Sequence, residues 1–314
     1  MMTKTKPAPD PILTMPDKRP VTTGRIGGSV TLKVVQGIGD IFWTYQKFSP
    51  YFDRINFTIM LTRDLPIQKR ALDWLKTWEK TGDVTTEVVP NAQYHRGAHG
   101  FFRLQDCFDN GFDRPIEYAV NAWLEAGVRI DDIDPGAMVD IDVQMKVADR
   151  PKYPAGEYLV LYASGSTTSK TIQHDQRYGV WTCEQWADFT NKFLDRVGKN
   201  MPVVVIGQFY DEEAIRSLTD LMMQHKREVS ALIGYPPSIV SSLLKHSSCF
   251  IGYQSGLGII ADALGARQIM LYFNQHRPML NTWCRREHIG GKFQADCFDC
   301  DTNALIERAA GAWQ

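Results

Sequence analysis

The feature that most constrains the fold is a strand, a turn, a helix and a second strand in direct succession between residues 249 and 273. The apolar segment Cys249–Tyr253 leads into a turn of small residues, Gln254-Ser-Gly-Leu-Gly, and a helix-forming run of Ile, Ala and Leu continues to Gly265. The apolar run 268–273 follows. Backbone N–H groups at such a helix start have no acceptor within the helix and lie at the positive end of its dipole. This arrangement suits a diphosphate.

Strands and helices alternate through most of the chain, which predicts an α/β fold with parallel sheets and helices on both faces. Thr182 and Gln185 have the spacing of a capping box at the start of one of these helices. The strands are expected at 30–35, 55–61, 84–89, 157–163, 201–207 and 268–273, and the helices at 41–52, 68–81, 115–127, 182–197, 211–225 and 238–246, with a further strand, turn and helix within 249–265.

The alternation lapses between residues 147 and 156, where Asp-Arg-Pro-Lys-Tyr-Pro-Ala-Gly predicts a linker. We therefore expect two Rossmann-like doubly wound domains, residues 29–150 and 151–314, with ligands bound in a cleft where the carboxyl ends of their strands meet. Residues 1–28 contain five prolines and no apolar core of a secretory signal, so they predict a flexible N-terminal tail.

Composition narrows the class of protein. The chain has 314 residues, 44% of them hydrophobic and 23% charged, with a formal net charge of −1. These values are typical of a soluble globular protein and give no general electrostatic case for binding nucleic acid or a membrane surface. No apolar run approaches the ~20 residues that span a bilayer. Without an export signal, the six cysteines predict a reduced, cytoplasmic protein.

A second turn follows the first predicted strand and places a carboxylate beside two glycines, Gly37-Ile-Gly-Asp40. Asp40 could act as a general base if it faces a ligand. It could equally be the N-cap of a helix that begins near Ile41, since Asp favours that position, and one residue can do both.

With these elements in place, the chain resembles the heptosyltransferases of glycosyltransferase family 9, which have the GT-B fold. The resemblance rests on the turn Gly37–Asp40, the helix and turn Tyr118–Gly127, the strand and acidic helix start Val203–Glu213, and the segment Ser238–Gly265. The last segment departs from the family at two positions: Gln254 stands where the family has aspartate, and Ile259 where it has histidine.

The resemblance implies an inverting transferase that takes a sugar from a nucleotide-diphosphate donor without a metal or other cofactor, with Asp40 as the base. It implies donor contacts from the C-terminal half and acceptor contacts from the N-terminal half. The donor residues would be Ser164, Ser166, Lys170, Gly207, Glu213, Ser255, Gly256 and Leu257. The acceptor residues would be Gly39, His95, Arg96, His99 and Arg103.

The acceptor would be a glycan or glycolipid such as a lipopolysaccharide core, which would allow peripheral attachment to the inner membrane. Histidines, arginines and aromatic residues gather between Tyr94 and Arg103, and this mixture suits an anionic or ring-bearing acceptor. The same residues would suit a modified nucleobase, because aromatic rings stack on bases. Phe101 and Phe102 could instead belong to the core.

Each assignment has a structural alternative. Gly256 and Gly258 could merely let a helix pack closely, residues 164–170 could be a solvated loop, and Glu213 or Asp211 could simply favour a first helical turn. Asp140 and Asp142 form an Asp-x-Asp pattern that could hold Mn²⁺, and Cys284, His288, Cys297 and Cys300 could hold zinc. For the whole chain, the alternatives are a nucleotide-sugar epimerase of the same fold and a non-catalytic nucleotide-sugar binding protein.

Overall fold

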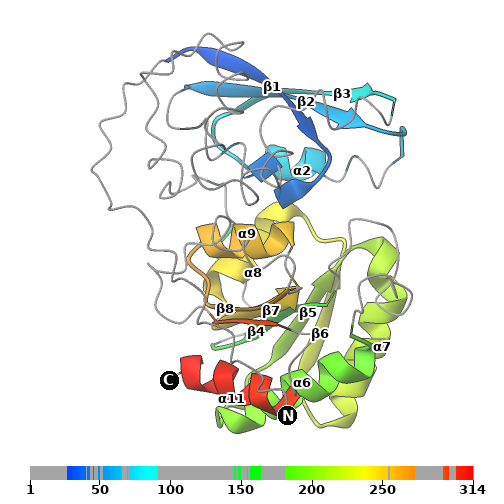
Figure 1. Ribbon diagram of the computed structural model, residues 1–314, viewed down its shortest axis with the longest axis vertical. Helices are drawn as coiled ribbons and strands as arrows, with labels where there is room; N and C mark the ends of the chain where they lie inside the picture. The colour runs from blue at the N-terminus through cyan, green and yellow to red at the C-terminus, as the bar shows by residue number, and fades with distance from the viewer. Residues whose placement is uncertain are drawn as a thin grey trace, which may run out of the picture.

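The computed structural model contains two parallel sheets, with helices packed between and below them (Figure 1). The residues that it describes are 27–39, 41–42, 45, 49, 52–65, 69, 71–90, 145, 148–149, 154, 156–163, 181–253, 255–272, 293–296 and 302–313.

The N-terminal half contains a sheet whose described strands are β1 (Ser29–Val35), β2 (Arg54–Leu61) and β3 (Thr81–Val88), hydrogen-bonded in that order and parallel. Side chains alternate across β1, so that Val30, Leu32 and Val34 are buried while Thr31 and Lys33 are exposed. This period of two is that of a strand with one covered face. The short helix α2 (Ala71–Leu75) packs on the covered side.

Two helices of the N-terminal half differ from the sequence prediction. Within the range 68–81 where a helix is expected, the α-helix ends at Leu75 rather than at residue 81, because Thr77 Oγ1 donates to the carbonyl oxygen of Trp74 and Trp78 forms an antiparallel bridge with Met145. The helix expected to start at Ile41 already includes residue 38, since the Ile41 N–H donates to the Gly37 carbonyl oxygen at 3.0 Å.

The C-terminal half contains a six-stranded parallel sheet in the order β6-β5-β4-β7-β8-β9. Counted within this half, the order is 3-2-1-4-5-6, which is the order of a doubly wound dinucleotide-binding sheet. The alternation in the sequence predicted four of these strands but not β6 or β9. The strands are β4 (Leu159–Tyr162), β5 (Val203–Gly207), β6 (Val229–Ile233), β7 (Cys249–Tyr253), β8 (Gln268–Tyr272) and β9 (Phe293–Asp296).

Helices cover both faces of this sheet (Figure 1). Helices α8 (Pro237–His246) and α9 (Gly256–Ala263) lie on the face toward the N-terminal half. The opposite face carries α6 (Cys183–Arg196), α7 (Glu212–Gln224, preceded by the 3₁₀ turn Phe209–Asp211) and the unpredicted α11 (Thr302–Trp313). The capping box of α6 is confirmed: Gln185 N–H donates to Thr182 Oγ1, and Thr182 N–H donates to Gln185 Oε1.

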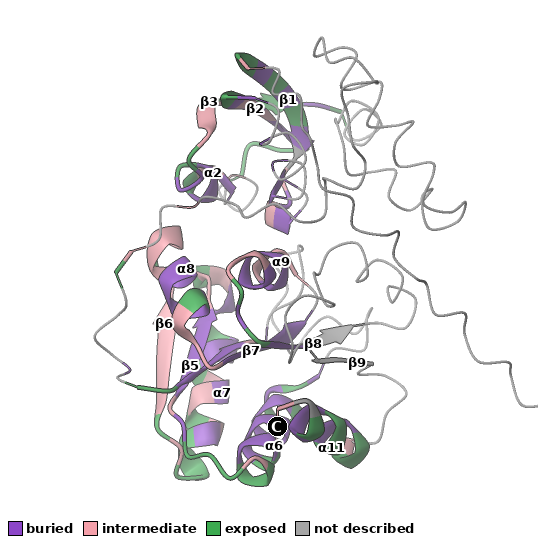
Figure 2. Cartoon of the chain, turned by 90° about the vertical axis from the view of Figure 1, so that its left-hand side faces the viewer, coloured by how far each residue is buried: buried purple, intermediate pink, exposed green. Residues whose placement is uncertain are grey.

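The buried apolar residues form two clusters, and their distribution over the elements is visible in Figure 2. One lies between the C-terminal sheet and helices α6, α7 and α11. The other runs without a break from β1, β2 and α2 through α8 and α9 to the near face of the C-terminal sheet. The two halves therefore share one core. No helix in the described part of the chain is long and apolar enough to cross a membrane.

Candidate functional site

The strand order reverses between β4 and β7, so this is the point where a doubly wound sheet binds its ligands. The register pairs Tyr162 with Gly252, which brings the carboxyl ends of the two strands together. Tyr253 anchors the end of β7, because its hydroxyl accepts the Trp181 N–H just before α6. In the sequence, residues 164–170 come after β4 and residues 255–257 after β7, so two of the predicted donor segments follow adjacent strands.

The N-terminus of α9 carries the predicted phosphate contacts. Ser255 is its N-cap, and the Ser255 Oγ accepts the N–H of Gly258 at 3.3 Å. Among the residues that the structure describes, the N–H groups of Gly256 and Leu257 have no hydrogen-bond acceptor. Two backbone donors at the positive end of a helix dipole can bind an anionic oxygen.

The turn after β1 packs directly onto this helix end. A methyl group on Gly256 would lie 2.6 Å from the Gly39 nitrogen and 3.2 Å from Cβ of Ile38. A methyl group on Gly39 would lie 3.0 Å from Cα of Gly256. The 2.6 Å distance to a backbone nitrogen is shorter than real contacts allow, so position 256 requires glycine, and a side chain at position 39 would force Ile259 or the start of α9 to shift. The two glycine turns that the sequence singled out are thus in backbone contact.

Asp40 is the residue after Gly39 and lies outside the described residues. Its two expected roles, general base and N-cap, stay predictions. Gly39, an expected acceptor contact, is buried against α9.

Ile259 packs in the same contact. It is buried, and its Cδ1 would lie 2.9 Å from a methyl group on Gly39. The histidine that the resemblance predicts here would place a polar ring in this apolar contact. The departure at position 259 therefore has a structural role in this chain.

The carboxyl end of β5 holds the predicted nucleoside contacts. A methyl group on Gly207 would lie 2.3 Å from Cδ1 of the buried Ile215, so the strand and α7 pack closely here. Asp211 is fully buried, and its carboxylate accepts the Gln208 N–H at 3.3 Å, which gives it a local structural role. Glu213 is exposed in the first turn of α7 and can reach a ligand.

Two exposed aromatic residues lie at the same edge of the sheet and were not predicted. Phe209 follows β5 and is 72% exposed, and Tyr235 follows β6 and is 44% exposed. The Phe209 ring lies over Gly234, where a methyl group would meet ring carbons at 2.3 and 2.4 Å. β5 and β6 end side by side, with Gly207 paired to Ile233. The only sequence signal was the turn Gly234-Tyr-Pro-Pro, which marks the end of a strand.

The remaining predicted residues lie outside the described part of the chain. They are the donor residues Ser164, Ser166 and Lys170, the acceptor residues His95, Arg96, His99 and Arg103, the pair Asp140 and Asp142, and the four candidate zinc ligands. Within the described ranges, no three His, Cys, Asp or Glu residues lie together as metal ligands would. Cys249 is fully buried in β7, and burial raises the pKa of its thiol to about 12, so it is no nucleophile at neutral pH.

Comparison with known proteins supports this architecture. No family model matches the sequence, and no curated protein is significantly similar to it. Among solved structures, the ADP-heptose LPS heptosyltransferase II of E. coli has a TM-score of 0.57 at 13% identity, covering 91% of this chain and 98% of its own. A glycosyl transferase family 9 protein from Veillonella parvula has a TM-score of 0.56 at 9% identity, covering 93% and 99%.

The E. coli heptosyltransferase WaaC, solved with ADP, has a TM-score of 0.55 at 11% identity and covers 90% of this chain and 99% of its own. Identities this low establish similarity of fold. Almost the full length of each protein aligns with this chain, so the arrangement of both halves is shared. The chain therefore has the GT-B fold, in the form found in family 9 glycosyltransferases and ADP-heptose heptosyltransferases.

Proposed function

We propose that this protein is a glycosyltransferase that uses a nucleotide-diphosphate sugar as donor. The observation that carries the proposal is the backbone contact between the Gly37–Gly39 turn and Gly256. It joins the residue before Asp40 to the backbone amide donors at the start of α9, at the switch point of the sheet. A carboxylate base and an anion-binding helix end on facing elements are what transfer from a diphosphate requires.

In this proposal Asp40 takes the proton from the acceptor hydroxyl as the acceptor oxygen bonds to the anomeric carbon. The bond from that carbon to the diphosphate oxygen breaks, so the sugar is transferred with inversion. The negative charge of the departing nucleoside diphosphate is stabilised by the N–H groups of Gly256 and Leu257 and by the dipole of α9. Lys170 and residues Ser164 and Ser166 would add donor contacts, and no metal is required.

The nucleoside would lie along the ends of β5 and β6. Glu213 is exposed there and can accept hydrogen bonds from ribose hydroxyls, while Phe209 offers an exposed ring on which a base can stack. The acceptor, a glycan or glycolipid in this proposal, would be held by the N-terminal half, with His95, Arg96, His99 and Arg103 as its contacts. A modified nucleobase is the other acceptor class that those residues suit.

The first experiment is a thermal-shift screen with ADP-, GDP-, UDP- and CMP-linked sugars, with and without Mn²⁺. A donor at a hundredfold excess over its dissociation constant should stabilise the native state by ~2.7 kcal/mol. We expect one nucleotide class to raise the melting temperature equally with Mn²⁺ and with EDTA. A shift that needs Mn²⁺ would contradict metal-independent binding, and the absence of any shift would refute the proposed donor class.

Turnover then separates the alternatives. With the donor identified, Asp40→Asn should still bind it but should lose transfer ~10²–10⁴-fold. Asp83→Asn is the matched control, because Asp83 is an exposed carboxylate on β3 of the same half. Conversion of the donor without any acceptor would instead identify an epimerase, and binding without turnover would identify a binding protein.

A further inference from the structure

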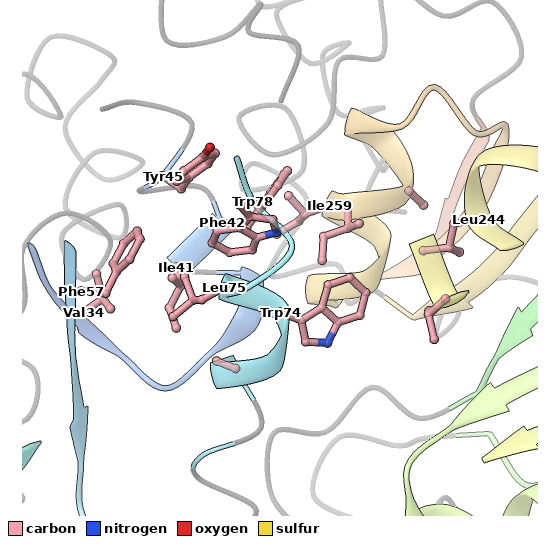
Figure 3. Packing of buried hydrophobic residues seen from close by; sticks show 14 of the residues in the cluster. Val34, Ile41, Phe42, Tyr45, Phe57, Trp74, Leu75, Trp78, Leu244 and Ile259 are labelled. Carbon is pink, nitrogen blue, oxygen red and sulfur yellow. The ribbon is translucent and has the colours of Figure 1, made fainter. Parts of the chain in front are cut away.

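The last residue of β7, Tyr253, has a side chain that reaches the start of α6. Side chains along a strand alternate between the two faces of its sheet. Phe250 belongs to the cluster that includes α8 and α9, part of which Figure 3 shows, whereas Ile251 and Tyr253 belong to the cluster on the side of α6 and α7. Tyr253 is therefore two residues before the N-cap of α9 in the chain, but its side chain lies on the opposite face of the sheet.

Three aromatic side chains surround this position, and with Tyr253 they form an aromatic cluster. The Tyr253 ring meets Trp186 edge to face, with ring centroids 4.8 Å apart. Trp181 meets Trp186 in the same way at 5.0 Å, and Phe189 lies 5.2 Å from Trp181. All four side chains are buried. Edge-to-face contacts are directional as well as favourable, so they orient the Tyr253 ring and with it the hydroxyl.

The Tyr253 hydroxyl accepts a backbone N–H that the start of α6 does not use. The capping box of α6 binds the N–H groups of Thr182 and Gln185, whereas the N–H of Trp181 precedes the cap and donates to Tyr253. A buried N–H without an acceptor is costly, so this bond has a structural value of its own. It also joins the chain that enters α6 to the chain that leaves β7.

Both ends of this bond belong to segments of the proposed donor site. In the sequence, Trp181 ends the stretch that follows β4 and contains the predicted donor residues between 164 and 170. Tyr253 comes just before the turn that presents the amides of Gly256 and Leu257. β4 and β7 are adjacent parallel strands at the point where the strand order reverses. The bond therefore ties the entry of α6 to the exit of β7 at the edge where a doubly wound sheet binds phosphates.

We infer that Tyr253 is a positioning residue for the donor diphosphate, acting through its bond to the Trp181 N–H. The inference rests on the proposed function, which supplies the diphosphate at the start of α9. The nucleoside is proposed to lie along the ends of β5 and β6, away from this bond. Loss of the hydroxyl should therefore weaken the binding of the phosphates and leave that of the nucleoside unchanged. A role limited to stability would affect neither selectively.

Calorimetry on the full chain tests this selectivity by comparing ADP with AMP, GDP with GMP and UDP with UMP. Tyr253→Phe removes one oxygen atom and keeps the ring. For the nucleotide class that the wild-type protein binds, the dissociation constant of the diphosphate should rise about tenfold, the size of one hydrogen bond. That of the monophosphate should change less than twofold. In the same variant the Trp181 amide should exchange its hydrogen at least tenfold faster.

Two control variants separate the bond from general stability. Tyr158→Phe is matched to Tyr253→Phe, because Tyr158 is buried and its hydroxyl donates to the Leu243 carbonyl oxygen at 2.9 Å, but it lies before β4, at the other end of the strand. Trp186→Phe disturbs the packing of the aromatic cluster and keeps both partners of the bond. Both should lower the stability in urea and leave the ratio of the two dissociation constants unchanged.

An unchanged ratio in Tyr253→Phe, or an equal change in Trp186→Phe, would overturn the inference and leave the proposed donor site standing. A wild-type protein that binds diphosphates no more tightly than monophosphates would refute the proposed site itself, and this role of Tyr253 with it. Should Tyr253→Phe fail to fold, hydrogen exchange of the wild-type protein decides the question. The diphosphate should then slow exchange of the Trp181 amide more than the monophosphate does, and equal exchange would overturn the inference.

Discussion

Replacing Phe209 with alanine should weaken nucleotide binding and leave the fold almost intact. Phe209 follows β5 at the carboxyl edge of the nucleotide-type sheet, and its ring is 72% exposed. Leaving an apolar ring in contact with water is unfavourable, and Phe209 lies where a donor nucleoside would bind. It is therefore a candidate for contact with a ligand, and the adenine, guanine, uracil or cytosine ring of a donor is the ligand that this edge would offer.

The size of each effect follows from that exposure. About a quarter of the Phe209 side chain is covered, or roughly 50 Å², so its removal should lower the free energy of unfolding by only about 1 kcal/mol. Stacking of an aromatic ring on a base is worth ~1–3 kcal/mol. The dissociation constant for the preferred nucleoside diphosphate should therefore rise about 5- to 150-fold.

Isothermal titration calorimetry with the free nucleoside diphosphate measures this directly, and urea unfolding measures the stability. Met223→Ala is the matched control, because Met223 is 56% exposed but lies near the other end of α7. It should not change nucleotide affinity. An unchanged affinity in Phe209→Ala would show that the base does not stack at this edge. A loss of stability near 3 kcal/mol would show that the ring is structural.

Three further predictions concern stability and the start of α9. Burial raises the pKa of Tyr45 and of Cys249 to about 12. Above pH 9–10 the folded state therefore binds more protons than the unfolded state. The free energy of unfolding should accordingly fall between pH 9 and 12. Urea titrations at each pH check this, and Tyr45→Phe with Cys249→Ala should flatten the curve. Thr182→Ala should lower the unfolding free energy by ~0.5–2 kcal/mol, measured by urea, since it removes the Oγ1 that accepts the Gln185 N–H at the start of α6. Ser255→Ala should cost about 1 kcal/mol through the lost bond to Gly258 but leave nucleotide affinity, measured by calorimetry, nearly unchanged, because the proposed donors are backbone amides.

The sequence predicted the parts of the fold that depend on local pattern. Strands with β-branched, apolar runs were found within a few residues of their bounds, and Thr182 was recognised as a cap because a capping box has a fixed spacing. The turns at Gly37 and Ser255 were found because small residues after a strand are locally visible. Their contact was not predictable in detail, since it joins residues far apart in the chain.

The elements that were missed have weak local signals. Each residue of β6 is only half-buried, and β6 is an end strand of the described sheet, so it lacks the continuous apolar run of a central strand. β9 has four residues, two of them polar. The helix at 68–81 was overestimated because apolar residues at helical spacing continue to Trp78, whose pairing with Met145 is a tertiary effect. No sequence pattern marks Phe209, because it is a candidate ligand contact only through its exposure in the folded protein.

The departures at Gln254 and Ile259 can be reconciled with a donor site because the chemistry proposed at α9 depends on the backbone. The N–H groups of Gly256 and Leu257 and the dipole of α9 are present whatever side chains flank them. Isoleucine at position 259 removes a group that would titrate near neutral pH and replaces it with one that packs against Gly39. A site built in this way exchanges one ionisable contact for an apolar contact between its two halves. Its dependence on the geometry of the Gly39–Gly256 contact should be correspondingly strong.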